Sequence, residues 1–242
     1  MFSQKEMFAR TSDLLLVPFY ISASIFFVVF QPLFNVPEES IVTAFFKALP
    51  VLCLAGFVYK KHLHPNGTDD HYIPSVLIGL LVSSLGDVFM LFRSSLLPLG
   101  VFVFSIAHFM YIVGLSGKQD PDNRKSVYLF VNLLVVMFLG YHESIDSNFT
   151  KLSLVAYFAL LMAVGAMASC RYEKERSVSA LWGVLGAAMF VFSDTLIVID
   201  TYSLGGGSLE CLVMILYYGA QFSLAISTVT EISPEDKEAK EK

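Results

Sequence analysis

Eight long apolar runs constrain the fold of this chain more than any other feature. A helix needs about 20 predominantly apolar residues to cross the hydrocarbon core of a bilayer. Such runs occupy residues 14–34, 41–59, 73–92, 96–115, 126–141, 150–170, 178–200 and 209–229. Only 15% of the 242 residues are charged, whereas a soluble globular domain carries about 25% charged residues. We therefore predict an all-α integral membrane protein, a bundle of about eight transmembrane helices.

The basic residues orient these predicted spans. With eight spans, the two termini and the even-numbered loops lie on one side of the membrane, and that side holds thirteen of the 16 Lys and Arg residues. The opposite side holds Arg93 and Lys151, and Lys47 lies inside the second span. Because basic residues concentrate on the cytosolic side, we predict that both termini are cytosolic.

This topology divides the chain into three parts. We predict a cytosolic N-terminus at residues 1–13, a single transmembrane domain at residues 14–229 and a disordered cytosolic tail at residues 230–242. The small net charge of -5 argues against a nucleic-acid partner. The three cysteines are scattered and show neither metal-ligand spacing nor a disulfide framework, so no metal site is expected.

Two aspartates interrupt the apolar runs. Asp87 ends the sequence Ser83-Ser84-Leu85-Gly86-Asp87, and Asp194 ends the sequence Phe190-Val191-Phe192-Ser193-Asp194. A charged side chain at the centre of a membrane helix costs roughly 2.5–3.5 kcal/mol even on lenient insertion scales. Two such residues in one small chain predict a shared polar site inside the membrane, and this site is the best indication of function.

Further polar residues fall at similar depths in other spans. Depth follows from the 1.5 Å rise per residue of a helix, counted from the outer end of each span. By this count Asp87, Asp194 and Lys47 lie about 8–9 Å deep. Five more polar side chains lie about 10–18 Å deep by the same rise, namely Tyr157, Tyr217, Tyr218, His108 and Gln221.

A structural interpretation of these polar residues stays open. A single Tyr, Gln or His within a span commonly hydrogen-bonds a neighbouring helix, and Lys47 could neutralise one aspartate or extend its ammonium group to the membrane surface. A Lys–Asp pair explains one aspartate but not both, which favours a functional role for Asp87 and Asp194.

Two buried acids beside one lysine can divide the work of acid–base catalysis. One carboxyl group stays protonated and donates, while the other stays ionised and accepts a proton or stabilises positive charge. Glycosidases divide two carboxyl groups in this way to cleave an acetal through an oxocarbenium-like transition state. The pattern therefore indicates a hydrolase for an acid-labile bond in a lipid. Neither a Gly-x-Ser-x-Gly motif nor a His-Glu-x-x-His motif is present in the sequence.

Short motifs along the chain resemble those of one family of membrane enzymes. They are Lys47-Ala48-Leu49-Pro50, Gly86-Asp87, His108-Phe109-Met110-Tyr111, Gly186-Ala187 followed by Phe190-Val191-Phe192-Ser193-Asp194, and Tyr217-Tyr218-Gly219-Ala220-Gln221. In this order and approximate spacing they are similar to the motifs of the YhhN-type transmembrane lysoplasmalogenases, over residues 14 to about 230. The resemblance implies hydrolysis of the vinyl ether bond of lysoplasmalogens, which releases a fatty aldehyde and glycerophosphoethanolamine or glycerophosphocholine.

This reaction leads to a hypothesis for the site. Asp87 and Asp194 are the expected catalytic acid and base, in either order, and Lys47 is expected to keep one of them ionised. The other expected substrate-binding or supporting residues are His108, Tyr111, Tyr157, Ser193, Tyr218 and Gln221. No metal or cofactor is expected. The expected partners are a lysoplasmalogen substrate and the bilayer, and the resemblance implies residence in the endoplasmic reticulum or another endomembrane.

Other functions fit parts of the same pattern. Membrane carboxylates with a lysine and a histidine also occur in proton relays, so a proton-coupled transporter of a small molecule or lipid is the main alternative. An intramembrane aspartyl protease would also pair two acids, but Ser84 stands where its Gly-x-Gly-Asp motif needs glycine, and no Pro-Ala-Leu motif follows. A scaffolding protein with a decayed site is a further alternative. The sequence also leaves open the head-group preference and whether the protein forms a homo-oligomer.

Overall fold

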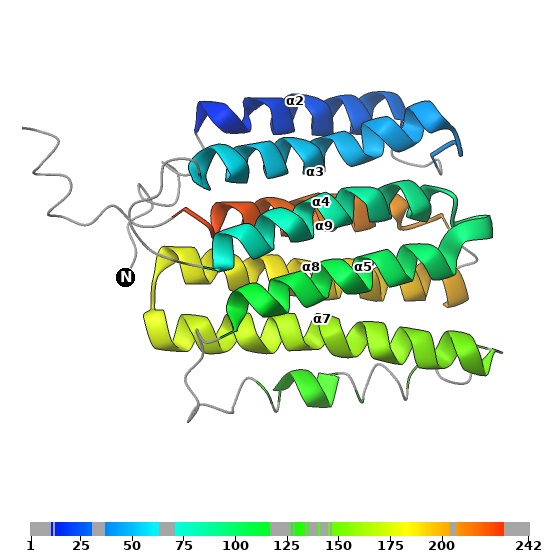
Figure 1. The fold of residues 1–242 in the computed structure, drawn as a ribbon. Helices are drawn as coiled ribbons and strands as arrows, with labels where there is room; N and C mark the ends of the chain where they lie inside the picture. Colours follow the sequence, from blue (N-terminus) through cyan, green and yellow to red (C-terminus); the bar gives the residue numbers. More distant parts are fainter. Residues whose placement is uncertain are drawn as a thin grey trace, which may run out of the picture.

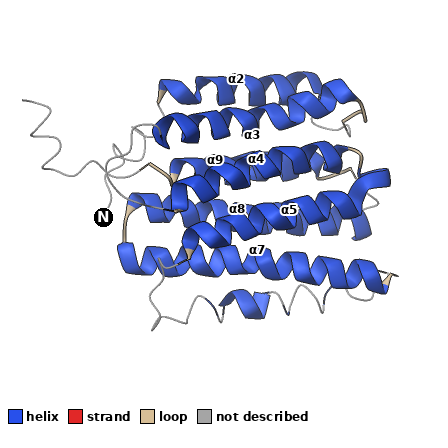
Figure 2. Ribbon diagram, in the orientation of Figure 1, coloured by secondary structure: helices blue, strands red, loops and turns tan. Residues whose placement is uncertain are grey.

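The computed structural model describes residues 11, 13–30, 37–62, 71–116, 127, 129–133, 135, 140, 145, 147–203 and 207–229. Within these residues the secondary structure is helical and contains no strand (Figure 1, Figure 2). The elements are η1 (Leu14–Leu16), α2 (Val17–Ile25), η2 (Phe26–Phe30), α3 (Ile41–His62), α4 (Tyr72–Leu91), α5 (Arg93–Leu115), α7 (Asn148–Glu175), α8 (Val178–Ser203) and α9 (Glu210–Ile226).

The helices correspond to the predicted apolar runs. In the described part of the chain, α3, α4, α5, α7 and α8 are long and apolar enough to cross a membrane, and Leu14–Phe30 and Glu210–Ile226 are shorter apolar helices. Half of the predicted run at 126–141 lies outside the described residues. The protein is therefore an all-α membrane bundle, while the count of eight spans and the cytosolic termini stay predictions.

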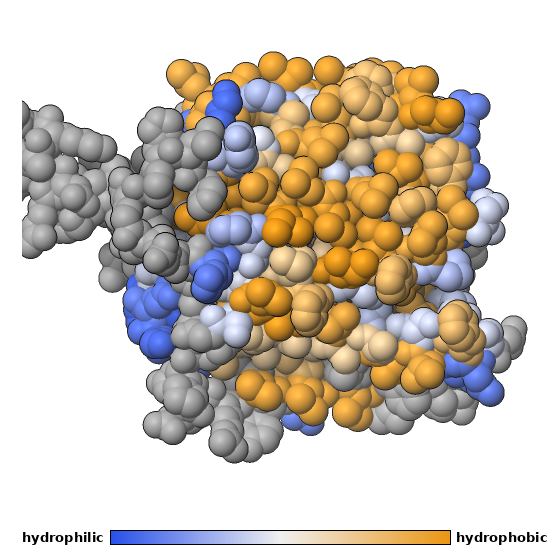
Figure 3. Space-filling view, in the orientation of Figure 1, coloured by the Kyte–Doolittle hydropathy of each residue, from blue (hydrophilic) through white to orange (hydrophobic). Residues whose placement is uncertain are grey.

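The outer surface has the character of a lipid-facing belt. Figure 3 shows apolar side chains over the middle of the bundle and hydrophilic side chains toward its two ends. Large apolar residues such as Phe102 and Phe192 are 62% and 64% exposed on this surface. Because exposed apolar patches of this extent are unfavourable in water, the belt supports placement in a bilayer.

Small residues allow the helices to approach closely. Helix α4 packs between α3 and α5, and α8 packs between α7 and α9. A methyl group at Gly79 of α4 would lie only 2.2 Å from Cε1 of Tyr111 on α5. The absence of a side chain at Gly79 therefore lets the Tyr111 ring lie directly against α4, as small residues do at membrane helix interfaces.

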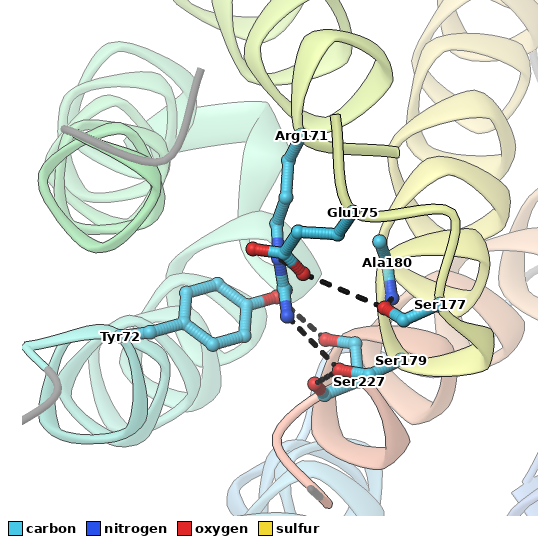
Figure 4. Close-up of polar contacts among 7 residues, drawn as sticks. All are labelled: Tyr72, Arg171, Glu175, Ser177, Ser179, Ala180 and Ser227. Carbon is cyan, nitrogen blue, oxygen red and sulfur yellow. Dashed lines mark hydrogen bonds and ion pairs between the residues drawn. The ribbon is translucent and has the colours of Figure 1, made fainter. Parts of the chain in front are cut away.

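A polar network fixes the end of the bundle where α7 turns into α8 (Figure 4). Helix α7 ends at Glu175, and the next residue, Arg176, has a left-handed backbone (φ 49°). The Ser177 hydroxyl then accepts the Ala180 N–H at the start of α8. Nearby, the buried Arg171 guanidinium lies 4.4 Å from the centre of the Tyr72 ring and donates to Ser179 Oγ at 3.0 Å.

The same network reaches the end of α9. The Tyr72 hydroxyl is 2.6 Å from Ser227 Oγ, and the Ser179 hydroxyl donates to the Ser227 carbonyl oxygen (Figure 4). These bonds join α4, α7, α8 and the residue that follows α9. They satisfy backbone and side-chain polar groups far from the polar site described next, so we interpret this network as structural.

Candidate functional site

A cavity lies at the other end of the bundle, where α4 ends and α5 begins and where α8 ends and α9 begins. Its walls come from α3, α4, α5, α7, α8 and α9, and the space between them is about 780 Å³, including the part open at the mouth. Most of the wall is apolar, but it carries five ionisable groups besides tyrosine, namely Lys47, Asp87, Arg93, Asp194 and Glu210.

Asp87 is held by a tyrosine from the last helix. It lies one turn before the end of α4 and is only 2% exposed. The Tyr217 hydroxyl of α9 donates to Asp87 Oδ2 at 2.8 Å. The neighbouring Gly86 lets the Phe104 ring of α5 close one side of the site, because a Cβ there would lie 2.8 Å from Phe104 Cε2.

Asp194 is held in the same manner by a tyrosine from α7. It lies on α8, is 8% exposed, and accepts a hydrogen bond of 2.5 Å from the Tyr157 hydroxyl at Oδ2. His108 Nε2 of α5 is 3.0 Å from the same hydroxyl oxygen. Because Tyr157 gives its one proton to Asp194, the His108 Nε2 nitrogen must carry the proton in this contact. Among the residues that the structure describes, the buried His108 Nδ1 has no hydrogen-bond partner.

A second chain of hydrogen bonds leads to Asp87. The Tyr111 hydroxyl donates to Gln221 Oε1 at 2.8 Å, and Gln221 Nε2 donates to the Tyr217 oxygen at 3.2 Å. Ser83 Oγ is 3.3 Å from the Tyr111 oxygen and acts as donor there, since the tyrosine proton is directed to Gln221. All donors in this chain are directed toward the carboxylate. Such buried chains polarise their members and hold the terminal group in one orientation.

Each carboxyl group keeps one oxygen for other contacts. The two tyrosines bond to Oδ2 of Asp87 and Oδ2 of Asp194, and within the described residues neither Oδ1 takes a hydrogen bond. Both residues line the cavity. The arrangement therefore places two oriented carboxyl groups in the wall of one mostly apolar cavity, which suits proton donation and acceptance at a bound molecule.

The predicted site residues separate into three positions. Lys47, Asp87, Tyr157, Ser193 and Asp194 line the cavity together. His108, Tyr111 and Gln221 are buried behind its wall. His108 bonds to Tyr157 and Gln221 bonds to Tyr217, the tyrosines that hold the aspartates, while Tyr111 bonds to Gln221. Tyr218 does not line the cavity, and its hydroxyl donates to the backbone carbonyl of Lys47 at 2.7 Å. What each residue does in a reaction stays a prediction.

Two of the predicted side chains make contacts other than those expected. Among the described residues, the Lys47 ammonium group forms no ion pair within 4.0 Å with either aspartate, although it shares their cavity and interacts electrostatically with Asp87. Ser193 uses its hydroxyl to donate to the Val213 carbonyl of α9 at 3.1 Å. The Ser193 contact joins α8 to α9 and fixes the helix segment that carries Asp194.

Three polar or charged residues of the cavity wall were not among the predicted site residues, namely Tyr217, Arg93 and Glu210. Tyr217 could have been recognised because it lies four positions before Gln221, so the two share one face of a helix. Arg93 and Glu210 were recognisable only as residues at the beginning of spans. They form an ion pair across the mouth of the cavity, with 2.8 Å between Arg93 Nη1 and Glu210 Oε2.

The described part of the chain contains no group of three or more His, Cys, Asp or Glu side chains that could hold a metal ion. The ionisable side chains of the site carry carboxyl, phenol, imidazole, ammonium and guanidinium groups. Two carboxyl groups in separate hydrogen-bond networks, facing a shared apolar space, form a pair suited to general acid–base catalysis.

Comparisons with known proteins agree with the motifs. The model of the YhhN family matches residues 42–228, a range that includes the site residues from Lys47 to Gln221. Lysoplasmalogenase TMEM86A of Bos taurus is 27% identical over 231 residues, which cover 90% of each chain. Lysoplasmalogenase TMEM86B of Homo sapiens is 26% identical over 91% of this chain and 88% of its own length.

Lysoplasmalogenase TMEM86B of Rattus norvegicus is 30% identical over 218 residues, covering 88% of this chain and 83% of the relative. No solved structure significantly matches the chain. The similarity to these relatives thus spans almost the whole length of both partners and is not confined to the site.

Proposed function

Because the chain belongs to the YhhN family, we propose that it is a lysoplasmalogenase, a membrane hydrolase for the vinyl ether bond of lysoplasmalogens. The products are a fatty aldehyde and glycerophosphoethanolamine or glycerophosphocholine. The names of the full-length relatives support the reaction. The observation that carries the proposal is the cavity inside the bundle, where Asp87 and Asp194 face one mostly apolar space.

The first step is proton transfer to carbon. Protonation of the vinyl ether at its β-carbon gives an oxocarbenium ion, and this needs an acid that is close to the double bond and shielded from water. Lys47 lines the cavity together with both carboxyl groups, and a cation favours the ionised form of a carboxyl group near it. In our proposal Asp87 is the carboxylate that stays ionised and Asp194 is the acid, with Tyr157 bonded to Oδ2 and the proton on Oδ1.

The second step adds water to the oxocarbenium ion. Asp87 accepts a proton from the water as its oxygen bonds to the cationic carbon, and the ionised carboxylates stabilise the positive charge before this attack. The resulting hemiacetal then collapses. Asp87 returns its proton to the glycerol oxygen that leaves, and Asp194 takes the proton of the hemiacetal hydroxyl, so both groups regain their starting states.

The remaining residues orient these groups and the lipid chain. Tyr217 and Tyr157 fix the two carboxyl groups, and Gln221 and His108 fix the tyrosines. The alkenyl chain of the substrate lies against the apolar part of the wall, which includes Phe104, Phe158, Phe190 and Met214. An apolar wall also limits the access of bulk water to the oxocarbenium ion until the positioned water attacks.

The test compares three lipids that differ only at the first glycerol carbon. Purified protein in detergent is given lysophosphatidylethanolamine with an alkenyl, an alkyl ether or an ester chain, and the released aldehyde or fatty acid is measured. The proposal predicts aldehyde from the alkenyl lipid and no cleavage of the other two. Absence of aldehyde from a folded sample, together with proton-driven flux in liposomes, would instead support the transporter.

A further inference from the structure

The ion pair at the cavity mouth has unused binding capacity. Arg93 is the first residue of α5 and Glu210 is the first residue of α9, and both line the cavity. Their side chains are 29% and 7% exposed. Within the described residues the pair makes a single contact, from Arg93 Nη1 to Glu210 Oε2. The other guanidinium N–H groups and Glu210 Oε1 are available to a molecule that enters.

Two charges of opposite sign side by side suit a ligand with the same arrangement. A guanidinium group presents several N–H donors in a planar fork that matches a phosphate group, and a carboxylate accepts hydrogen bonds from an ammonium group. The pair has no net charge. It therefore favours a zwitterion over an anion of similar size, because an added anion would meet the Glu210 carboxylate beside Arg93.

The position of the pair agrees with the length of a lysolipid. Asp87 lies four positions before the end of α4 at Leu91, which corresponds to about 6 Å along the helix axis, and Arg93 begins α5 just beyond that end. A phosphate group bound at the mouth would thus be separated from the carboxyl groups by about the length of a glycerol backbone. The chain attached to the first glycerol carbon would then pass between Asp87 and Asp194 and continue along the apolar wall.

We infer that Arg93 and Glu210 form the head-group subsite, in which Arg93 binds the phosphate and Glu210 binds the ammonium group of a zwitterionic lysolipid. The inference rests on the proposed function for the identity of the lipid. Binding uses the guanidinium N–H groups and the Glu210 Oε1 atom that the pair leaves unused, so the contact from Arg93 Nη1 to Glu210 Oε2 stays in place.

Kinetic measurements on a series of head groups separate this role from a purely structural one. The substrates are alkenyl lipids with glycerophosphoethanolamine, with glycerophosphate, which lacks the amine, and with glycerol alone. Glu210→Gln should raise KM about tenfold for the first substrate and not for the second, the size expected for one charge-assisted hydrogen bond. Arg93→Gln should raise KM for both phosphate-bearing substrates and leave KM for the alkenylglycerol unchanged.

The Lys61–Asp13 ion pair serves as a matched control, with 2.6 Å between Lys61 Nζ and Asp13 Oδ2. Neither Lys61 nor Asp13 lines the cavity. Lys61→Gln should leave KM unchanged for all three substrates. If the mouth pair only joins two helices, Glu210→Gln and Arg93→Gln will alter all three substrates equally, or none of them, and the inference is overturned. An unchanged kcat with a head-group-dependent KM supports it.

A binding measurement keeps this inference separate from the proposed reaction. The alkyl ether analogue of the ethanolamine lipid has no vinyl ether to cleave, so its Kd can be measured for an active or an inactive protein. Weaker binding by Glu210→Gln, without weaker binding of the alkyl glycerophosphate, supports the subsite even if no aldehyde is ever released. Equal Kd values for wild type and Glu210→Gln overturn it even if the vinyl ether is cleaved.

Free glycerophosphoethanolamine distinguishes a lipid head group from a soluble phosphodiester. The subsite predicts that this molecule competes with the lipid in wild-type protein but binds far more weakly, since it lacks the chain that occupies the apolar wall. Competition that is equally strong in Glu210→Gln would overturn the assignment of Glu210 to the ammonium group.

Discussion

Removal of one hydroxyl group, in Tyr217→Phe, tests whether the tyrosines control the carboxyl groups. Asp87 loses the 2.8 Å hydrogen bond from Tyr217, and Gln221 Nε2 loses its acceptor at 3.2 Å. A hydrogen bond to a charged group contributes about 1.5–3 kcal/mol. If this energy is lost mainly in the transition state, kcat/KM falls about 10–100-fold, since each 1.36 kcal/mol is a factor of ten.

The assay for Tyr217→Phe is aldehyde release from the alkenyl ethanolamine lysolipid in detergent, with thermal unfolding of the same sample. Tyr72→Phe is the matched control, because it also removes one buried hydroxyl, which lies 2.6 Å from Ser227 Oγ at the opposite end of the bundle. The control should lower Tm and leave kcat/KM of the folded protein unchanged. Folded Tyr217→Phe with kcat/KM within a factor of two of wild type would refute the reasoning.

Two further predictions concern the stability of the bundle. Gly79→Ala should lower Tm by overpacking, at a cost of about 1–3 kcal/mol, because its Cβ would lie 2.2 Å from the Tyr111 ring. The control is Gly56→Ala, whose Cβ would have nothing within 4 Å and which should not lower Tm. Equal Tm values for the two variants would contradict the packing. Burial raises the pKa of Asp13, but the hydrogen bonds from Lys61 and the Leu15 N–H and the Lys61 charge together hold this pKa below 3.8. Since the lowered pKa means that the folded state favours the ionised form, Asp13→Asn should lower Tm slightly at neutral pH, and the difference from wild type should vanish as pH falls through that pKa. A difference that grows in acid would contradict this sign.

The positions of the helices were predictable because the cost of exposing backbone polar groups in lipid leaves few alternatives to a helix. The residues at which the helices end were less predictable. Helix α7 continues to Glu175, five residues beyond the predicted limit, through a polar segment that begins with the buried Arg171. A prediction from apolar residues ends the helix where the sequence becomes polar at the membrane surface. The helix itself continues as long as its backbone hydrogen bonds are satisfied.

The two aspartates were predictable from the cost of burying charge, but their partners were not. Depth along a helix axis follows from sequence position, whereas the direction in which a side chain points depends on how each helix is rotated in the bundle. Tyr217 and Tyr218 illustrate this, since they have nearly the same depth and point about 100° apart. Only Tyr217 reaches Asp87, and Tyr218 bonds to the Lys47 carbonyl instead.

The mouth of the cavity was missed for a different reason. Arg93 contributed to the orientation of the predicted spans only as one basic residue on the less basic side. Its pairing with Glu210 joins residues 117 positions apart. Nothing in the sequence around Arg93 or around Glu210 indicates that the α4–α5 connection and the start of α9 adjoin one cavity.

The most direct test of the central claim is the activity of three Asp→Asn variants on the alkenyl ethanolamine lysolipid. Asp87→Asn and Asp194→Asn change the two cavity carboxyl groups, whereas Asp200→Asn changes a buried aspartate of α8 that lies outside the cavity wall and accepts the Gly207 and Leu209 N–H groups. The account predicts that folded Asp87→Asn and Asp194→Asn release no aldehyde above background and that Asp200→Asn stays active. Full aldehyde release by either cavity variant would contradict it.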